Sequence, residues 1–323
     1  MCTAVTYLTK DHYFGRNLDL EHYFREAVTI TPRNYPLRFR HAEDLTEHYA
    51  MIGMASVVDD YPLYYEATNE KGLSMAGLNF PGFAAYYPGQ PDKDNVTPFE
   101  FLPWILGQCA NLEEALQALS QINLLNEPFS ESLPLSPLHW IIADRNRSVT
   151  VETLADGMRI HENPIGVLTN NPTFDYHLLR LADHMDLSAS PAENRLAPEM
   201  DIWPYSRGLN TVGLPGGLDS ASRFIRAAFM KQNSRCDGTE VASVSQFFHI
   251  LGSVAQPRGA VIHRDAYEIT YYSSCCNTDR GIYYYTTYDN SRITAVDMHR
   301  EDLERSDLIT YPLNLDSDIR RMN

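Results

Sequence analysis

Short runs rich in apolar and strand-forming residues recur through the first 80 positions of the chain, as in β-strands. These runs are "MCTAVTYL", "HYFGRNLDL", "YAMIGMASVV" and "LYYEATNEKGLSMAGLNF". Lys10 and Asp11 indicate a turn between the first two runs, and Asn69 to Gly72 indicate another inside the last run, because such residues favour turn conformations. The N-terminal part is therefore predicted to be a set of strands joined by turns.

The hydrophobic period changes after Thr97, where apolar residues begin to recur three and four positions apart. Asn111 and Glu114 have the spacing of a capping box, which predicts a helix over "NLEEALQALSQINLL" after a first helical piece at "TPFEFLPWILGQC". The same period predicts three further helices, at "PTFDYHLLRLADHM", "DSASRFIRAAFMKQN" and "VASVSQFFHILGSVA".

Strand patterns return at "LHWIIADRNRSVTVETL", where Asp144 to Arg147 indicate a hairpin turn, and near the end at "AYEITYYSSCC" and "GIYYYTTYDNSRITAVDM". Strand groups at both ends with helices between them predict an α+β fold of two sheets that share one core and carry helices outside. We see no linker, so residues 1–323 are predicted to form one domain. The Pro-rich stretches "YYPGQPDKDN" and "SASPAENRLAPEMDIWPYSRGLN" are predicted to be long loops on that body.

The 323 residues have the composition of a folded globular protein, with 44% hydrophobic and 21% charged positions. A formal net charge of −16 argues against a nucleic-acid partner, because phosphate binding requires a basic surface. No run approaches the roughly 18 apolar residues of a membrane helix, and the first dozen residues lack the apolar segment of a signal peptide. Five scattered cysteines fit a reducing interior. We therefore expect a cytoplasmic protein without a membrane partner.

Cys2 stands directly behind the initiator methionine. Methionine aminopeptidases remove Met1 when the second residue is small, so we expect the mature chain to begin with Cys2. One residue then carries a thiol with an ordinary pKa of about 8.5 and an α-amine with one of about 7.7 to 8.0. Since the amine can accept the proton of the thiol at neutral pH, Cys2 combines a nucleophile with its own base.

Two further residues have positions that suit this chemistry. Arg16 returns beside Cys2 if the first two runs pair as a hairpin, and a fixed cation there would stabilise a thiolate. Asp19 would hold the ammonium group. The alternative is an exposed cysteine with an unrelated arginine and aspartate at a strand end, and the spacing alone favours this alternative.

Seven segments, in this order, resemble the choloylglycine hydrolase family, which contains conjugated bile acid hydrolases and penicillin V acylases: "MCT", "FGRNLDL", "ITPRNYP", "NEKGLSMAGLNFPG", "IGVLTNNPTFDYH", "GLPGGLDSASRFIR" and "FFHILGSVA". The resemblance runs from Cys2 to the "GIYYYTTYDN" segment. It implies an N-terminal nucleophile hydrolase with an αββα sandwich that cleaves a linear amide. It further implies a homotetramer and neither a metal nor an organic cofactor.

The resemblance also implies a set of catalytic positions: Cys2, Arg16, Asp19, Asn79, Asn170 and Arg223. Asn171 is an ambiguous neighbour of Asn170. Side-chain N–H groups of the two asparagines would stabilise the oxyanion formed when a thiolate attacks an amide. Arg223 would add positive charge near the thiolate. Taken singly, Asn79 and Asn170 are more typical of turns, and only the complete set supports the catalytic interpretation.

Asn79 also bears on the substrate, because penicillin V acylases in this family tend to have tyrosine at the position where bile salt hydrolases have asparagine. We therefore expect a bile salt hydrolase that cleaves glycine or taurine conjugates through a Cys2 thioester. Residues in segments that resemble the binding loops of the family are Leu18, Phe24, Tyr61, Phe129 and Leu133. They would form the apolar pocket for the steroid.

Three alternatives stay open at this point. The first is penicillin V acylase or another acylase of the same fold. The second is a serine hydrolase, since "GLSMA" resembles a nucleophile elbow at Ser74, although that motif requires a helix directly after the serine. The third is a non-catalytic sterol-binding module. A zinc site is not indicated, because the histidines and cysteines lack metal-ligand spacing, and Cys275 and Cys276 are predicted to pack inside a strand.

Overall fold

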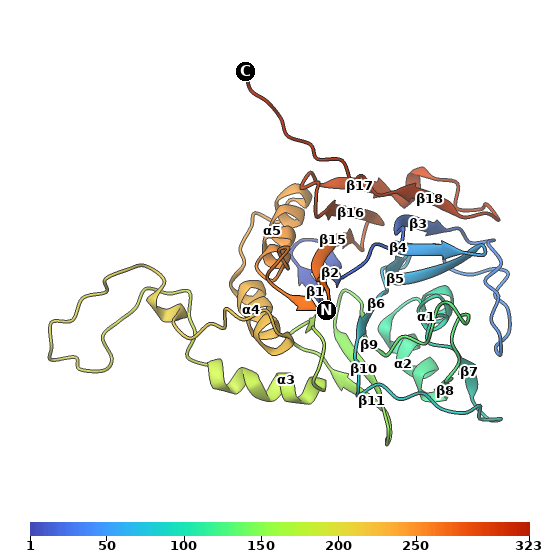
Figure 1. The fold of residues 1–323 in the computed structure, drawn as a ribbon, viewed down its shortest axis with the longest axis horizontal. Coiled ribbons are helices and arrows are strands. Elements are labelled where there is room, and N and C mark those ends of the chain that lie inside the picture. Colours follow the sequence, from blue (N-terminus) through green and yellow to red (C-terminus); the bar gives the residue numbers. More distant parts are fainter.

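The strands and helices of the computed structural model, which describes residues 1–323, follow the predicted order of strands, helices, strands, helices and strands (Figure 1). The main strands are β1 (Cys2–Leu8), β2 (His12–Leu20), β3 (Ala27–Thr31), β4 (Met51–Val58), β5 (Tyr61–Asn69), β6 (Ser74–Asn79), β9 (Leu138–Ala143), β10 (Ser148–Leu154), β11 (Gly157–Glu162), β15 (Ile269–Asn277), β16 (Ile282–Thr287), β17 (Thr294–Asp297) and β18 (Ile309–Pro312). Short strands are β7 (Asp94–Val96), β8 (Ile122–Leu124), β12 (Val167–Leu168), β13 (Ile262–His263) and β14 (Ala266–Tyr267). The helices are α1 (Phe101–Gln108), α2 (Leu112–Gln121), α3 (Phe174–Arg180), α4 (Ser220–Asn233) and α5 (Glu240–Gly252), with the 3₁₀ turns η1 (Leu181–His184), η2 (Leu209–Thr211) and η3 (Met298–Arg300).

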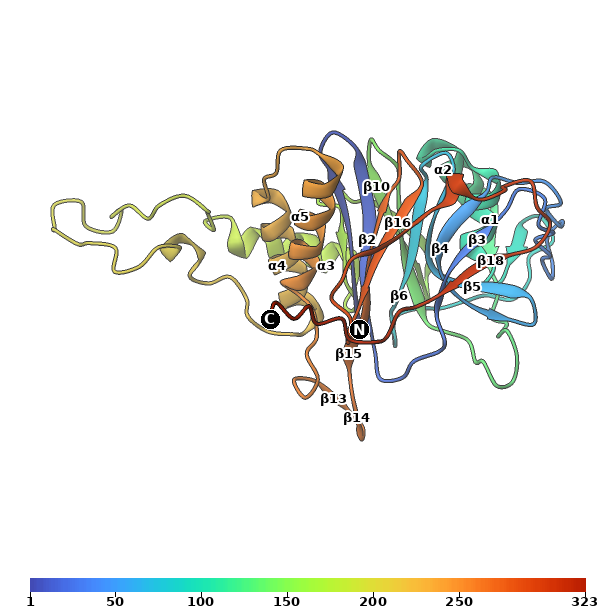
Figure 2. The same ribbon diagram turned by 90° about the horizontal axis from the view of Figure 1, so that it is seen from above.

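Two large antiparallel sheets face each other. One has six strands in the order β12-β1-β2-β15-β16-β17, and the other has eight in the order β11-β10-β9-β6-β5-β4-β3-β18. Helices α4 and α5 cover the outer face of the six-stranded sheet, and α1 and α2 cover the outer face of the eight-stranded sheet (Figure 2). The layers are therefore helix, sheet, sheet and helix, which confirms the α+β sandwich predicted from the sequence.

Strands β1 and β2 lie at the centre of the sandwich and are buried on both faces. Helices α4 and α5 lie on one side of them, and β5 and β6 of the facing sheet lie on the other. This position explains why "MCTAVTYL" carries no charged residue, since both of its faces contact protein. Any charged side chain on β2 must therefore find partners inside the protein.

Helix starts follow the capping signals of the sequence. The side chain of Asn111 accepts a hydrogen bond from the backbone N–H of Glu114, as the capping-box spacing predicts. The carboxylate of Glu114 returns to the N–H of Ala110 instead of that of Asn111. Asp219 caps α4 by accepting from the N–H of Ser222, which fixes the first turn of the helix that carries Arg223.

Some elements were missed or misplaced by the pattern of the sequence. Strands β3, β11, β12 and β18 had no clear periodic signal, and the last predicted strand segment divides into β16 and β17. The stretch at residues 188–210 was predicted to be a loop on the body, but residues 185–218 form an arm that projects away from it between α3 and α4 (Figure 1). The arm follows η1 and contains the single turn η2.

Candidate active site

Cys2 opens β1 and is buried, with 2% of its surface exposed. The antiparallel pairing of β1 with β2 places Cys2 opposite Leu18 and Ala4 opposite Arg16. Diagonal neighbours of such a pair lie on the same face of the sheet. Arg16 therefore returns to the side of Cys2, and the predicted hairpin is confirmed.

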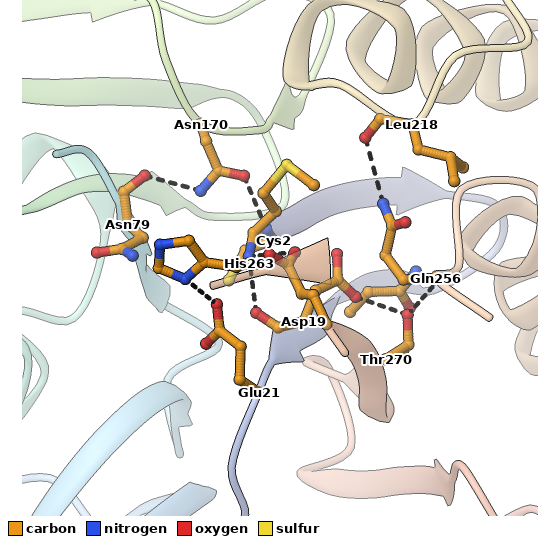
Figure 3. A network of polar contacts seen from close by, with 12 residues as sticks. Cys2, Asp19, Glu21, Asn79, Asn170, Leu218, Gln256, His263 and Thr270 are labelled. Carbon is orange, nitrogen blue, oxygen red and sulfur yellow. Dashed lines mark hydrogen bonds and ion pairs between the residues drawn. The ribbon is translucent and has the colours of Figure 1, made fainter. Parts of the chain in front are cut away.

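Asn170 and Arg223 hold the backbone of Cys2; Figure 3 shows the contact from Asn170. The Oδ1 atom of Asn170 accepts hydrogen bonds from the backbone N of Cys2 at 2.7 Å and from Nη2 of Arg223 at 2.8 Å. Nη1 of Arg223 donates to the carbonyl oxygen of Cys2 at 2.5 Å and to Oγ1 of Thr3 at 2.6 Å. Burial lowers the pKa of Arg223, whereas the negative groups of Asp19 and Cys2 raise it. The result is a cation fixed beside the nucleophile.

Asp19 is a buried carboxylate with one oxygen that lacks a partner. Its Oδ1 accepts from the hydroxyl of Thr270 at 2.6 Å, whereas Oδ2 is buried and forms no hydrogen bond. Burial raises the pKa of Asp19, while Arg223 and the N-terminal amine lower it. The Met1 ammonium donates to the backbone carbonyl of Asp19 at 2.8 Å and to Oε1 of Glu268 at 2.5 Å. One carboxylate side chain, that of Glu268, and one backbone carbonyl, that of Asp19, therefore hold the N-terminal end of the chain.

Arg16 is fully enclosed, with 1% of its surface exposed. Its Nη1 donates to the carbonyl oxygens of Tyr65 at 3.1 Å and Gly77 at 2.5 Å, both on the facing sheet. Burial lowers the pKa of Arg16, but Cys2 and other acidic groups outweigh burial and raise the pKa above its ordinary value. Arg16 thus stays charged between the two sheets.

The side-chain amides of Asn79 and Asn170 differ in whether they already form hydrogen bonds within the protein. The carbonyl oxygen of Asn79 accepts from Nδ2 of Asn170 at 2.7 Å, so the donor side of Asn170 is already occupied. The side chain of Asn79 at the end of β6 is exposed and has no hydrogen bond in the protein. Asn171 is directed elsewhere, with its Nδ2 on the carbonyl of Pro81 at 2.5 Å. Of the adjacent residues Asn170 and Asn171, Asn170 is therefore the one whose side chain contacts Cys2.

The five residues predicted to bind substrate are distributed over several places: Leu18, Phe24, Tyr61, Phe129 and Leu133. Leu18 is buried opposite Cys2, and Phe24 is 48% exposed in the loop after β2. The rings of Tyr61 and Phe129 lie 6.0 Å apart, and Phe99 packs against both. Leu133 is half-buried in the loop that precedes β9. Their part in substrate binding remains a prediction.

Several residues near Cys2 were not found from the sequence. Glu268 and Thr270 reach the N-terminus because β15 pairs with β2, with Thr270 opposite Asp19. His263 extends from the β13–β14 hairpin and pairs with Glu21 at 2.7 Å (Figure 3). No local signal marks these residues, because their positions depend on a pairing between segments about 250 residues apart.

Other sequence signals have structural explanations. Ser74 lies in β6, is fully buried, and shares a hydrogen bond of 2.8 Å with Thr68. No helix follows it, so the nucleophile elbow is absent and the serine hydrolase alternative is wrong. Cys275 and Cys276 are buried in β15, as predicted. A cavity of about 950 Å³ is lined mainly by polar side chains and does not include Cys2.

All five cysteines are free. No group of three or more His, Cys, Asp or Glu side chains is placed to hold a metal ion. The longest and most apolar helices still fall short of what crossing a membrane requires.

Two facing antiparallel sheets between helix layers, with a cysteine at the start of a central strand, define an N-terminal nucleophile hydrolase. Residues 2–311 match the sequence profile of linear amide C–N hydrolases, choloylglycine hydrolase family. A bile salt hydrolase/transferase from Lactiplantibacillus plantarum is 52% identical over the full length of both chains, and one from Clostridium perfringens is 37% identical over the full length of both. The chain belongs to the choloylglycine hydrolase family and is a hydrolase of linear amide bonds.

Solved structures agree with this assignment. The C2A mutant of conjugated bile acid hydrolase from Clostridium perfringens has a TM-score of 0.93 and 37% identity, with full coverage of both chains. Penicillin V acylase from Agrobacterium tumefaciens has a TM-score of 0.77 at 20% identity, covering 96% of this chain and 90% of that chain. The second likeness concerns the fold alone.

Proposed function

We propose that this enzyme hydrolyses the amide bond that joins glycine or taurine to a bile acid, with Cys2 as the nucleophile. The observation that carries the proposal is the setting of Cys2, whose nitrogen and carbonyl oxygen are held by Asn170 and Arg223 at the start of the chain. Relatives named bile salt hydrolase match over the whole chain and support bile salts as the substrate.

The proposed active form lacks Met1, so the α-amine of Cys2 takes the place of the peptide nitrogen that contacts Asn170. The amine accepts the thiol proton, and the sulfur attacks the amide carbonyl carbon. The C–N bond then breaks, and the proton passes to the leaving nitrogen of glycine or taurine. Water, losing a proton to the same amine, attacks the thioester and releases the bile acid, after which that proton returns to sulfur. The buried Oδ2 of Asp19 has no hydrogen-bond partner. It supports the form without Met1, because it is available to accept a hydrogen bond from the ammonium group of Cys2.

Stabilisation of the oxyanion is assigned to the exposed amide of Asn79, which has no partner in the protein. A preorganised donor of this kind contributes on the order of 3 kcal/mol. Asn170, whose donor is occupied by the Asn79 carbonyl, would instead hold the Cys2 nitrogen. Arg16 and Arg223 supply positive charge on two sides of the nucleophile, which favours its thiolate form.

Turnover of glycocholate, taurocholate and phenoxymethylpenicillin by one preparation tests the substrate. We expect release of glycine or taurine, with slower or no cleavage of the penicillin. Preferential cleavage of phenoxymethylpenicillin would favour the acylase alternative. Stoichiometric bile salt binding without release of any amino acid would identify a sterol-binding module and contradict the proposal.

Acyl transfer is a second candidate activity, because two full-length relatives are named hydrolase/transferase. A thioester on Cys2 can react with an amine in place of water. We expect that glycocholate incubated with an excess of a different amino acid yields some of the new conjugate. Formation of free bile acid alone, at every amine concentration, would restrict the enzyme to hydrolysis.

We further propose a homo-oligomer, a tetramer by resemblance to the family, assembled through the arm formed by residues 185–218. Leu196, Trp203 and Tyr205 on this arm are 92%, 77% and 88% exposed, and exposed apolar side chains in such numbers favour protein contacts. Light scattering of a Trp203→Glu, Tyr205→Glu double variant is expected to give a smaller mass than the parent. Met322→Glu, on the exposed C-terminal tail, serves as a control that leaves the mass unchanged.

We also propose that residues 1–323 form one domain, because the last strands complete sheets begun by the first. β15 pairs with β2, and β18 pairs with β3. A single transition in urea, seen equally by circular dichroism and tryptophan fluorescence, is the expected result. Two separate transitions would contradict it.

The cytoplasm is the compartment we propose, since it keeps free thiols reduced and the nucleophile is one of five free cysteines. Fractionation of the producing cells is expected to recover the activity with cytoplasmic markers. Recovery in the medium or the cell wall would contradict this assignment.

A further inference from the structure

Strand β5 contains a bulge that turns two consecutive side chains toward the facing sheet. Met54 pairs with Glu66 and Ala55 pairs with Tyr64, so Tyr65 is an extra residue in the ladder between β4 and β5. Tyr65 packs against the core between the two sheets, and Glu66 contacts tyrosines of the six-stranded sheet. Successive residues of a regular strand point to opposite faces, and a bulge changes this alternation.

Glu66 is a buried carboxylate, 1% exposed, held by two phenols. Its Oε2 accepts from the hydroxyl of Tyr272 at 2.7 Å, and its Oε1 accepts from the hydroxyl of Tyr283. Burial raises the pKa of Glu66, while Arg16 and the two phenols lower it. Burial also raises the pKa of both phenols well above the ordinary value, so they remain donors.

The same bulge supplies two of the groups that surround the Arg16 guanidinium. Nε of Arg16 lies 3.9 Å from Oε2 of Glu66, and Nη1 donates to the carbonyl oxygen of Tyr65. The carbonyl of Gly77 on β6 also accepts from Nη1. The third nitrogen, Nη2, forms no hydrogen bond within the protein. The guanidinium is therefore held through Nε and Nη1.

We propose that Glu66 is a positioning residue for amide hydrolysis, which orients the Arg16 guanidinium beside Cys2 and limits the positive charge that the thiol experiences. The inference deepens the proposed function, because it takes Cys2 as the nucleophile. Glu66 does not need to contact the substrate. It acts through Arg16, which lies diagonally across the β1–β2 pair from Cys2.

Other titratable groups around Cys2 come from different elements and do not duplicate this role. These groups are Asp19 on β2, Arg223 on α4, Glu268 and Tyr272 on the segment that forms β15, and the ion pair of Glu21 with His263 at the rim. Glu66 is the carboxylate that the eight-stranded sheet contributes to this cluster. Its removal changes the charge next to Arg16 while the other groups stay in place.

The test uses Glu66→Gln, which keeps the volume of the side chain and removes its charge. We expect kcat to fall by about 10- to 100-fold with KM nearly unchanged, because misorientation near the reacting atoms affects the transition state more than binding. The rate at which iodoacetamide alkylates Cys2 is measured against pH by mass spectrometry of the N-terminal peptide. We expect the midpoint of this rate–pH profile to move to lower pH. Without the Glu66 carboxylate beside it, Arg16 stabilises the Cys2 thiolate more strongly.

Tyr283→Phe is the second variant: it keeps the Glu66 charge but removes one donor that disperses it, so a smaller shift of the alkylation midpoint, toward higher pH, is expected. Tyr64→Phe is the matched control: it deletes a phenol hydroxyl on the same strand, one that forms a hydrogen bond with Thr31 and not with Glu66.

Thermal unfolding confirms that each variant is folded. A folded Glu66→Gln with an alkylation midpoint that is unchanged or raised would overturn the proposal, even if kcat falls. Alkylation needs no bile salt, so this result is independent of whether the parent enzyme cleaves glycocholate.

Discussion

The layer between the two sheets and the layer between the eight-stranded sheet and helices α1 and α2 differ in what they bury. The second layer is an apolar cluster built around residues such as Phe101, Leu112 and Trp140. The first layer is also largely apolar, but it encloses the charged side chains of Arg16 and Glu66. Buried charges cost several kcal/mol each unless they are paired, so a layer that keeps them is adapted to chemistry as well as to stability.

Arg16 and Glu66 in the first layer, and Arg223 on the helix side of the six-stranded sheet, each have partners in more than one element. Arg16 contacts β5 and β6, Glu66 contacts β15 and β16, and Arg223 of α4 contacts β1 and Asn170. The network thereby connects both sheets and a helix to the nucleophile. Substitutions in the first layer should change activity, whereas substitutions in the second layer should change stability alone.

Cys2→Ala is expected to have the largest effect, a complete loss of amide hydrolysis, because the only nucleophile is removed. The fold should remain, since a small side chain leaves the backbone bonds to Asn170 and Arg223 intact. Glycocholate turnover and circular dichroism measure the two quantities. Substantial residual turnover would contradict the mechanism.

Phe101→Ala tests the apolar layer. Phe101 is fully buried, with 0% of its surface exposed to solvent. Truncation of such a side chain lowers the free energy of unfolding by about 3 to 5 kcal/mol. Urea unfolding measures the loss, and kcat of the folded protein should equal that of the parent. Ile319→Ala, on the exposed C-terminal tail, is the control expected to change neither.

Asn170→Ala tests the contact with the Cys2 nitrogen. Loss of both the Cys2 and the Arg223 hydrogen bonds should lower kcat by about 100- to 1000-fold, the effect of deleting one preorganised polar group at a reaction centre. Asn171→Ala removes an amide of the same turn that bonds to Pro81 instead, and it should stay within a few fold of the parent. Equal losses in the two variants would mean that the turn matters only for structure.

His12→Gln should have the smallest effect, and it concerns stability at acid pH. Burial lowers the pKa of His12 to about 4, below its ordinary value of about 6.5. The unfolded chain therefore binds a proton before the folded one does, so the native state loses stability as pH falls from about 6.5 to 4. We expect the parent to lose up to about 3 kcal/mol relative to the variant over this range, measured by urea unfolding at each pH. A difference independent of pH would contradict the assignment.

The sequence allowed most of the long strands, the helices and the hairpin of β1 and β2 to be predicted, because these depend on local periodicity and turns. Arg16 follows from that hairpin. Asn79, Asn170 and Arg223 could be proposed only through the family resemblance, since nothing local links segments so far apart. Glu66 and Glu268 were not found from the sequence. A bulge in β5 and the pairing of β15 with β2 place them near Cys2, and neither feature has a local sequence signal. The projection of the arm away from the body was not predicted either, because a polar, Pro-rich sequence indicates a loop but not where that loop lies.

The measurement that tests the central claim most directly is the intact mass of the catalytically active enzyme, determined before and after reaction of Cys2 with iodoacetamide. We predict a chain that lacks exactly one methionine and loses glycocholate hydrolysis in proportion to labelling of its N-terminal peptide. An active preparation that still carries Met1 ahead of Cys2, or one that stays active when Cys2 is fully labelled, would contradict the account.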